Sequence, residues 1–230
     1  MARLLYDLAG ADPARRFSPY CWRIRMALAH KDLPVETVPW QFLDKEAIAP
    51  SGHGKVPVLV DDGKWLAESW TIACYLEETY PDRPSLFGGG KGPELSHYFS
   101  VLGDTLVGAF FRFVAGDIEK VLAGENRAYY RESREKRIGM TLEELTADRE
   151  GRLPALRDSL APLRAALKAQ PYLGGDKPLY ADYAVFGAFQ WARCVSPFQL
   201  LAEDDPIRSW RDRLLDAFDG LARKAPAFDT

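Results

Sequence analysis

The segment Ser18-Pro19-Tyr20-Cys21 carries the residue types best suited to handling a thiol. Its spacing is that of a Cys-x-x-Cys redox motif in which serine replaces the first cysteine. Serine cannot form a mixed disulfide, but its hydroxyl can donate a hydrogen bond to a bound sulfur. Because Ser-Pro also favours the start of a helix, N–H groups and the positive end of the helix dipole would lie beside that hydroxyl and favour a thiolate. On these four residues alone, a plain helix cap is the alternative.

Two further dipeptides have the chemistry to hold a peptide. A proline at position 57 indicates a strand edge or a turn, and a cis Val56–Pro57 bond would leave the Val56 backbone free to pair with an extended ligand. At a predicted helix start, Ser69 can offer its N–H and hydroxyl to a carboxylate, and Glu68 can pair with an ammonium group. An edge-strand proline and an ordinary helix cap with a surface acid are the alternatives. Taken together, the three sites match a cysteine-containing peptide with a free amino-acid end.

The elements that position these residues alternate between strand and helix in the first third of the chain. We expect a helix from Ser18 and another from Ser69 to about Tyr80, with strands at 3–8, 34–38, 56–60 and around Trp65. The Pro- and Gly-rich segment 81–93 predicts a linker. Everything beyond it has a helical pattern: an apolar segment at 96–115, a long leucine-bearing segment from a Thr141–Glu144 capping box to 167, a nearly all-apolar segment at 181–195, and an amphipathic stripe at 207–221.

The composition is that of an ordinary globular protein, with 230 residues of which 47% are apolar and 27% charged. Residues 1–84 carry 10 basic and 12 acidic side chains and the whole chain carries 30 and 33, so we expect no nucleic-acid partner. We also expect no membrane span, because no apolar run approaches the necessary ~18 residues, and no signal peptide. Three widely spaced cysteines predict neither a disulfide framework nor a zinc site, and a reducing cytoplasm is the expected compartment.

The chain resembles a glutathione S-transferase. The resemblance rests on FSPYCW, GKVPVLVDDGKWLAESWTIACYLEETYPDRP and LGGDKPLYADYAVFGAF, which occur in this order and at suitable spacing. Within that superfamily, SPYCWR, SREK, TLEEL, ADREGRLP, LAEDDPIRSW and DAFDGL are similar to bacterial lignin β-aryl-etherases of the type related to fungal A-class transferases.

The resemblance implies a thioredoxin-like α/β domain over residues 1–84 that binds glutathione, and an all-α domain over residues 94–230 that contributes a hydrophobic pocket. It assigns activation of the glutathione sulfur to Ser18. The other glutathione contacts fall on Lys55, Val56, Pro57, Glu68 and Ser69, with Trp40 or Gln41 at the glycyl carboxylate. An aromatic-lined pocket would face the sulfur, and we expect Tyr20, Phe110 and Phe113 in its wall.

The remaining reactive side chains are expected to be structural. Cys21, Cys74 and Cys194 lie in apolar helical patterns, which favours packing roles, and His30, His53 and His97 are scattered, with only His53 close to the expected ligand edge. Leu179 stands where the family usually has Ser or Thr. The side-chain half of that cap is therefore lost, and Asp182 is expected to act through backbone N–H groups alone.

The function that follows is attack of glutathione thiolate on a hydrophobic, aromatic electrophile, with reductive cleavage of a β-aryl ether as the narrower form. A non-catalytic binder of aromatic compounds is the first alternative. A thiol–disulfide reductase is the second, and the serine at position 18 argues against it. Because the family is commonly homodimeric, we expect a homodimer and a small-molecule partner.

Overall fold

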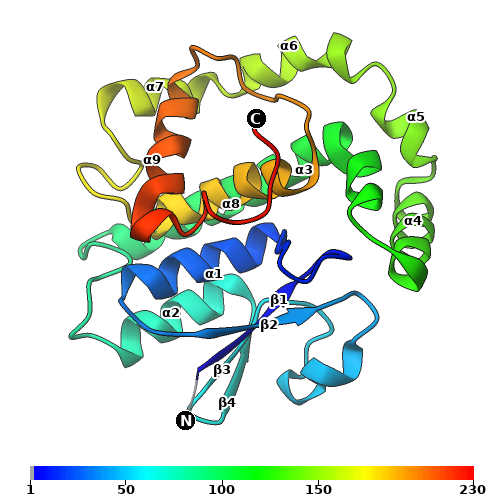
Figure 1. Ribbon diagram of the computed structural model, residues 1–230. Coiled ribbons are helices and arrows are strands. Elements are labelled where there is room, and N and C mark those ends of the chain that lie inside the picture. Colours follow the sequence, from blue (N-terminus) through cyan, green and yellow to red (C-terminus); the bar gives the residue numbers. More distant parts are fainter. Residues whose placement is uncertain (1–2) are drawn as a thin grey trace.

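The computed structural model describes residues 3–230 as a small mixed sheet and a larger helical part (Figure 1). The strands are β1 (Leu4–Leu8), β2 (Glu36–Trp40), β3 (Val58–Asp61) and β4 (Lys64–Ala67), in the order β2-β1-β3-β4. β1 and β2 are parallel, while β3 is antiparallel to both β1 and β4. With helix α1 (Pro19–His30) crossing between the two parallel strands, the predicted thioredoxin-like fold is confirmed.

Helix α1 begins where the sequence predicts. Ser18 has extended backbone angles and its Oγ accepts a hydrogen bond from the Cys21 N–H at 3.2 Å, while Pro19 occupies the first helical turn. Helix α2 (Ser69–Thr79) differs from expectation by one residue. Its N-cap is Glu68, with a φ of +69°, and Ser69 is the buried first residue of the helix.

The helical part follows an irregular connector and confirms the expected all-α domain. It contains a long helix α3 (Gly92–Lys120), a helix α4 (Gly124–Ile138), a central helix α8 (Tyr180–Val195) and a last helix α9 (Pro206–Gly220). All residues of α8 are buried, as its nearly all-apolar sequence predicts. It packs against both α3 and α1, and so joins the helical domain to the helix that carries Ser18 (Figure 1).

The leucine-bearing segment from Thr141, whose prolines at 154 and 162 are expected to kink or divide it, forms three helices. The capping box is present: Thr141 Oγ1 accepts from the Glu144 N–H at 3.1 Å, and the Glu144 carboxylate accepts from the Thr141 N–H at 2.8 Å. It starts only the short α5 (Leu142–Thr146), because Asp148 then takes a φ of +53° that interrupts the helical path. The chain continues as α6 (Arg149–Ser159) and α7 (Ala161–Ala169).

Helix α3 has the length and apolar composition of a membrane-spanning helix. The criterion of an uninterrupted apolar run does not detect this helix in the sequence, because polar residues interrupt the run. Length and composition do not separate such a helix from the core helix of a globular domain. In this structure its buried residues, among them Leu106, Phe110 and Val114, pack against α8.

The contact between α8 and α1 depends on the absence of a side chain at Gly187. A Cβ atom there would lie 2.3 Å from the Pro19 carbonyl oxygen, a backbone atom that cannot move without displacing the Ser18 turn. We therefore expect Gly187→Ala to lower the free energy of unfolding by about 1–3 kcal/mol, the usual cost of overpacking. Urea unfolding measures this change. Gly108→Ala on α3 is the control, because a Cβ at Gly108 meets no atom within 4 Å, and equal stability of the two variants would contradict the prediction.

Asp182 organises the start of α8 as the sequence predicts, with one correction. Its carboxylate accepts hydrogen bonds from the backbone N–H groups of Leu173, Gly174 and Leu179 at 2.7, 2.9 and 3.0 Å. The expectation that backbone groups act alone is wrong, because the Trp210 indole N–H also donates to it at 2.8 Å. The carboxylate thereby ties α9 and the preceding loop to α8.

Candidate active site

A cavity of about 500 Å³ lies between the start of α1, the connector after β2 and helices α3 and α4. A second cavity of about 240 Å³ continues from it toward the start of α2. The two share four lining residues: Tyr20, Lys55, Val56 and Asp104. Residues from both domains therefore surround one continuous site.

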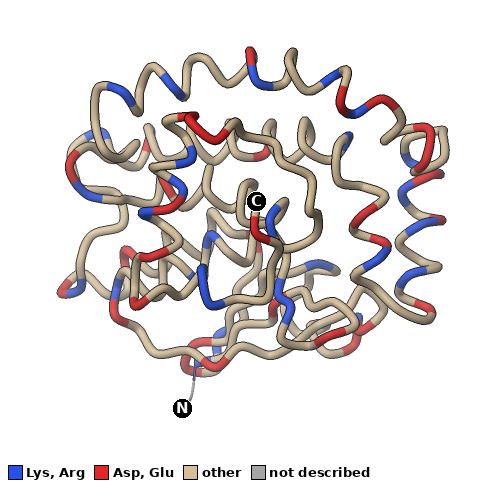
Figure 2. Tube along the Cα trace, turned by 45° about the horizontal axis from the view of Figure 1, so that its top comes forward, with Lys and Arg blue, Asp and Glu red and all other residues tan. Residues whose placement is uncertain are grey.

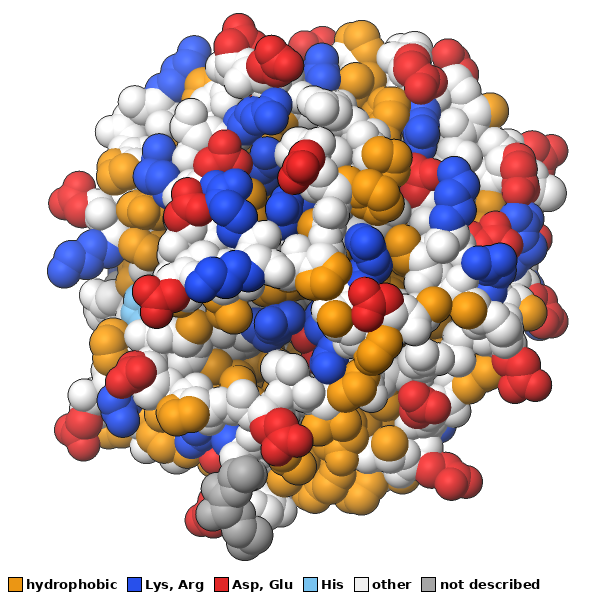
Figure 3. Space-filling view, in the orientation of Figure 1, with side chains coloured by type: hydrophobic (Ala, Val, Ile, Leu, Met, Phe, Trp, Pro, Cys, Tyr) orange, Lys and Arg blue, Asp and Glu red, His pale blue; other side chains and the backbone are white. Residues whose placement is uncertain are grey.

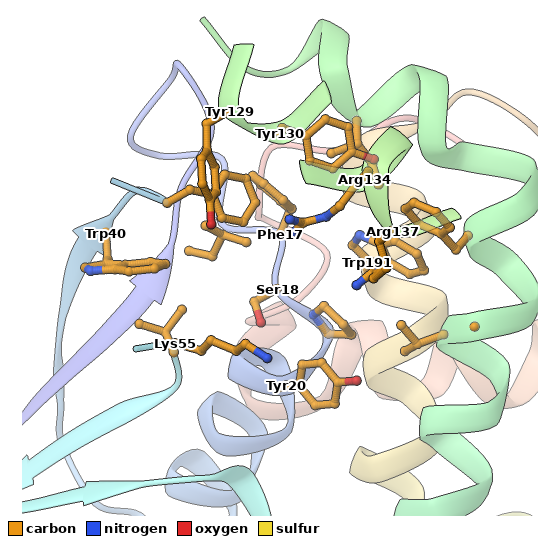
Figure 4. A pocket seen from close by; sticks show the side chains of 18 of the residues that line it. Phe17, Ser18, Tyr20, Trp40, Lys55, Tyr129, Tyr130, Arg134, Arg137 and Trp191 are labelled. Atoms are coloured by element: carbon orange, nitrogen blue, oxygen red, sulfur yellow. The ribbon is translucent and has the colours of Figure 1, made fainter. Parts of the chain in front are cut away.

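Ser18 lies in the wall of the larger cavity, near its centre in Figure 4. Its oxygen accepts the Cys21 N–H, which fixes the hydroxyl group at the helix start. The hydroxyl hydrogen has no acceptor among residues 3–230, so it is available to an atom in the cavity. A sulfur anion in that position would also face the N-terminal end of α1.

Cys21 has the packing role that the sequence predicts. It is fully buried, and burial raises the pKa of its thiol well above the ordinary value, followed by the effect of the Asp7 charge. Cys194 is also fully buried, whereas Cys74 is only half-buried. The cysteine of the SPYC segment thus has neither the exposure nor the ionisation of a redox thiol.

Val56 and its neighbours line both cavities. The Val56–Pro57 peptide bond is cis. Val56 lies just before β3, outside the β1–β3 ladder, and its backbone N–H and carbonyl have no hydrogen-bond partner among the described residues. These groups are free to pair with an extended peptide. The Lys55 side chain projects into the larger cavity (Figure 4).

Glu68 and Ser69 lie at the far end of the smaller cavity, where the sequence places an amino-acid site. The Ser69 N–H is in the first turn of α2 and has no intrahelical acceptor. The Tyr180 hydroxyl donates to the Ser69 carbonyl at 3.1 Å and so fixes this turn against α8. The Glu68 carboxylate lies 2.7 Å from Nε2 of His53, which also lines this cavity.

The two residues expected at a glycyl carboxylate are both committed to other contacts. Trp40 lines the larger cavity with its ring, but its indole N–H donates to the Asp44 carbonyl at 2.7 Å. Gln41 does not line it: its amide donates to Gly10 and accepts from Asn126. The cation in this region is Lys45, which lines the cavity with its Nζ 4.8 Å from the centre of the Trp40 ring. Burial lowers the pKa of Lys45, and the charges of Lys55 and Arg134 lower it further.

Of the three residues expected in the aromatic wall, Tyr20 lines the larger cavity, whereas the choice of Phe110 and Phe113 is wrong. Both phenylalanines are buried away from the cavity, Phe110 against Phe189 and Phe113 against Phe198. Positions 110 and 113 share a helix face that turns toward the core, while the adjacent face presents Phe111 to the cavity.

Tyr20 is held by a buried arginine. The Arg23 guanidinium lies 4.8 Å from the centre of the Tyr20 ring and donates to Asp104 at 2.7 Å. Burial raises the pKa of the Tyr20 hydroxyl, and the Asp104 charge acts in the same direction. Arg23 thus positions two residues of the cavity wall, one from each domain.

Helix α4 supplies residues that the sequence analysis missed. Tyr129, Tyr130, Arg134 and Arg137 line the larger cavity. Figure 4 shows both arginines reaching toward the space above Ser18. Arg134 lies in the SREK segment that carries the resemblance, but no sequence pattern directs it or Arg137 toward the site, because α4 has the mixed charges of an exposed helix, visible in Figure 2.

The larger cavity is strongly cationic. Four basic side chains line it, Lys45, Lys55, Arg134 and Arg137, against one acid, Asp104, which already pairs with Arg23. None of the four forms an ion pair within residues 3–230. On the surface seen in Figure 3, by contrast, basic and acidic side chains are interspersed.

Comparison with known families gives two matches. Residues 14–84 match the family model described as "Glutathione S-transferase, N-terminal domain", and residues 95–218 match "Glutathione S-transferase, C-terminal domain". Among curated proteins, the chain is 40% identical over 112 residues to "Glutathione S-transferase DHAR2" of Arabidopsis thaliana. That alignment covers 46% of each chain, so the chain matches about half the length of this relative.

Solved structures resemble the chain over nearly its whole length. A glutathione transferase from Phanerochaete chrysosporium, GSTFuA3, is 26% identical, with a TM-score of 0.81, and the match covers 93% of this chain and 96% of that one. A glutathione S-transferase from Ceriporiopsis subvermispora, solved in complex with glutathione, has a TM-score of 0.83 at 24% identity and covers 95% and 97% of the two chains. This second likeness bears on the fold alone.

Proposed function

Because the chain belongs to the glutathione S-transferase family, whose co-substrate is glutathione, we propose that it transfers the glutathione sulfur to an aromatic electrophile bound in the larger cavity. The observation that carries this proposal is the Ser18 hydroxyl. It is fixed by the Cys21 N–H, free to donate, and directed at a space with aromatic walls.

Glutathione fits the joined cavities in one direction. Its γ-glutamyl end would lie in the smaller cavity, with the α-carboxylate at the Ser69 N–H and hydroxyl and the ammonium at Glu68. The cysteinyl backbone would pair with Val56, which brings the sulfur to Ser18. The glycyl carboxylate would then reach Lys45, whose ammonium lies in the larger cavity.

The chemical step is a substitution at carbon. The thiolate forms a carbon–sulfur bond as the leaving group departs with the electron pair of the broken bond, and Ser18 stabilises the thiolate before attack. For a β-aryl ether the leaving group is a phenolate, so each turnover consumes one glutathione and yields one thioether and one phenol. The resemblance of SPYCWR, TLEEL and LAEDDPIRSW to β-etherases motivates this narrower proposal.

Incubation with glutathione and the separate enantiomers of a β-O-4 ketone model compound tests the narrower proposal. We expect phenol release from at least one enantiomer, matched one to one by a glutathione thioether. Conjugation of 1-chloro-2,4-dinitrobenzene without phenol release from either enantiomer would exclude the etherase and retain the transferase. Binding of aromatic compounds with no turnover of any electrophile would instead favour the non-catalytic binder.

The reductase alternative has little support at this site. Ser18 supplies no thiol, and the pKa of Cys21 is raised by burial, so neither residue can provide the attacking thiolate. A homodimer and a cytoplasmic location remain part of our proposal. The location is consistent with three free cysteines.

A further inference from the structure

Two arginines of α4 line the larger cavity without an acidic partner in the described part of the chain. Arg134 and Arg137 are three residues apart and so lie on the same face of the helix. Arg134 makes one side-chain hydrogen bond, to the neighbouring Ser133 hydroxyl. Arg137 makes no side-chain hydrogen bond within residues 3–230. Most of the N–H donors of these two guanidinium groups are therefore unused.

Arg131, on the same helix, differs from these two arginines because three acidic side chains neutralise its charge. Its guanidinium contacts the carboxylates of Glu119, Glu135 and Glu143, with Nη1 2.8 Å from Glu135 and Nη2 2.7 Å from Glu143. Glu135 lies next to Arg134 in the sequence, but its carboxylate pairs with Arg131. The acids of α4 and its neighbours thus satisfy Arg131, and Arg134 and Arg137 face the cavity without them.

Aromatic rings lie beside both guanidinium groups. The Arg134 guanidinium lies 5.1 Å from the ring centres of Phe42 and Tyr130, and that of Arg137 lies 5.6 Å from the centre of the Phe111 ring. These contacts supply none of the hydrogen-bond acceptors that a guanidinium group needs. The N–H donors left without a partner among the described residues can bind a carboxylate through two parallel hydrogen bonds.

We infer that the second substrate of this site is an aromatic electrophile that carries a carboxylate, and that Arg134 and Arg137 bind that carboxylate. This inference rests on the proposed function and specifies its substrate class. The ring would occupy the space bounded by Phe111, Tyr129 and Trp191, between the two guanidinium groups and Ser18. An entirely apolar substrate would displace water from the half-buried Arg134 and leave its charge without a partner, which is unfavourable.

The carboxylates of glutathione do not account for Arg137. In the proposed binding mode one carboxylate lies at Ser69 and the other at Lys45, on the side of the cavity formed by the thioredoxin-like domain. Arg137 belongs to α4, and in Figure 4 it lies beside Trp191 of α8, across the cavity from Lys55 and Trp40. Arg137 is therefore farther than Arg134 from the residues that would bind glutathione in this mode.

Two electrophiles with the same ring and leaving group, one anionic and one neutral, test the inference when each is compared between wild type and variant. With 4-chloro-3,5-dinitrobenzoate and its methyl ester, glutathione displaces the same chloride from the same ring. For the Arg134→Gln/Arg137→Gln variant we expect kcat/KM for the acid to fall by at least about tenfold, the range for a hydrogen-bonded charge, with a change of less than about threefold for the ester. Lys136→Gln is the matched control. It removes one positive charge from the same turn of α4, at an exposed residue that does not line the cavity.

A binding measurement separates this inference from the proposed function. Quenching of tryptophan fluorescence, to which Trp40 and Trp191 of the cavity contribute, gives the dissociation constants of 3,5-dinitrobenzoate and its methyl ester with no turnover. Tighter binding of the acid that the double variant abolishes and Lys136→Gln retains would support the carboxylate site, even if no electrophile is conjugated. Equal binding of acid and ester by the wild type, or an acid preference that survives in the double variant, would overturn it. An effect on the dissociation constant of glutathione alone would assign the arginines to glutathione and also overturn it.

Discussion

Replacement of Ser18 by alanine is expected to raise the pKa of the thiol of bound glutathione by about one to two units. A hydrogen bond to a charged group contributes ~1.5–3 kcal/mol, and one pKa unit corresponds to ~1.4 kcal/mol. The wild-type hydroxyl favours the thiolate, so its removal favours the neutral thiol. The N-terminal dipole of α1 remains in the variant, and it keeps the thiol pKa below that of free glutathione.

The consequence for catalysis depends on pH in a defined direction. Below both pKa values the fraction of thiolate falls tenfold for each unit by which the pKa rises, so in that pH range kcat/KM should fall by ~10–100-fold. Well above both values glutathione is ionised in either protein, and this loss should disappear. Thiolate absorbance of the bound complex near 240 nm, titrated against pH, gives the pKa directly.

Comparison of two variants separates the sulfur contact from the helix cap, because Ser18 does both. Ser18→Ala and Ser18→Gly remove the same hydroxyl, but alanine at an N-cap costs about 1 kcal/mol of stability and glycine only a few tenths. We expect equal thiol pKa values in the two variants and a lower unfolding free energy in Ser18→Ala. Ser100→Ala is the control, since it removes a buried hydroxyl that bonds to Ser96 away from the cavity. An unchanged thiol pKa in both Ser18 variants would remove Ser18 from the mechanism.

The sequence was sufficient to predict the thioredoxin-like half of the site because its signals are local. A Ser-Pro pair fixes the start of α1 within one turn, and the Asp62-Gly63 turn fixes β3 against β4. Ser18, Val56 and Ser69 follow from such signals together with the family resemblance, and all three line the joined cavities. The local signals locate Glu68 and Ser69, but they predict Ser69 as the N-cap of α2, whereas Glu68 is the N-cap. The positive φ of Glu68 has no signal in the sequence.

The opposite wall of the site depends on tertiary packing and could not be predicted in the same way. The sequence of α3 is apolar on several sides, so no pattern distinguishes the face toward the core from the face toward the cavity. Phe110 and Phe113 are the residues expected at the cavity, yet both are buried in the core, whereas Phe111 lines the cavity. The sequence pattern around Arg134 and Arg137 is typical of solvated arginines on a charged helix. Their place in the cavity wall follows only from the packing of α4 near Ser18. Lys45 begins the 3-10 helix η1 (Lys45–Ser51) after β2, and so short a helix has no periodic pattern that assigns a direction to a side chain.

Asp182 should be the residue outside the site whose loss is most damaging. Its carboxylate has no exposed surface and accepts three backbone N–H groups and the Trp210 indole N–H. Alanine at this position would leave four donors without an acceptor, of which the Leu173 N–H and the Trp210 indole N–H are buried, and each unsatisfied buried group costs ~1–3 kcal/mol before water enters the gap. We expect a loss of about 3–5 kcal/mol of unfolding free energy, which for a chain of this size lowers Tm by roughly 10 °C.

Loss of the Asp182 carboxylate should also weaken glutathione binding, because α8 packs against the residues that position Ser18 and Ser69. Tyr180, the residue at the start of α8, donates to the Ser69 carbonyl, and Gly187 contacts Pro19 next to Ser18. A variant with a displaced α8 should therefore bind glutathione more weakly at temperatures where it is still folded.

Circular dichroism gives Tm and calorimetric titration at 15 °C gives the dissociation constant. Asp158→Ala, which removes an exposed carboxylate with no partner among the described residues, should change neither. A Tm for Asp182→Ala within 2–3 °C of the wild type would show that α9 and the loop before α8 hold their places without this carboxylate.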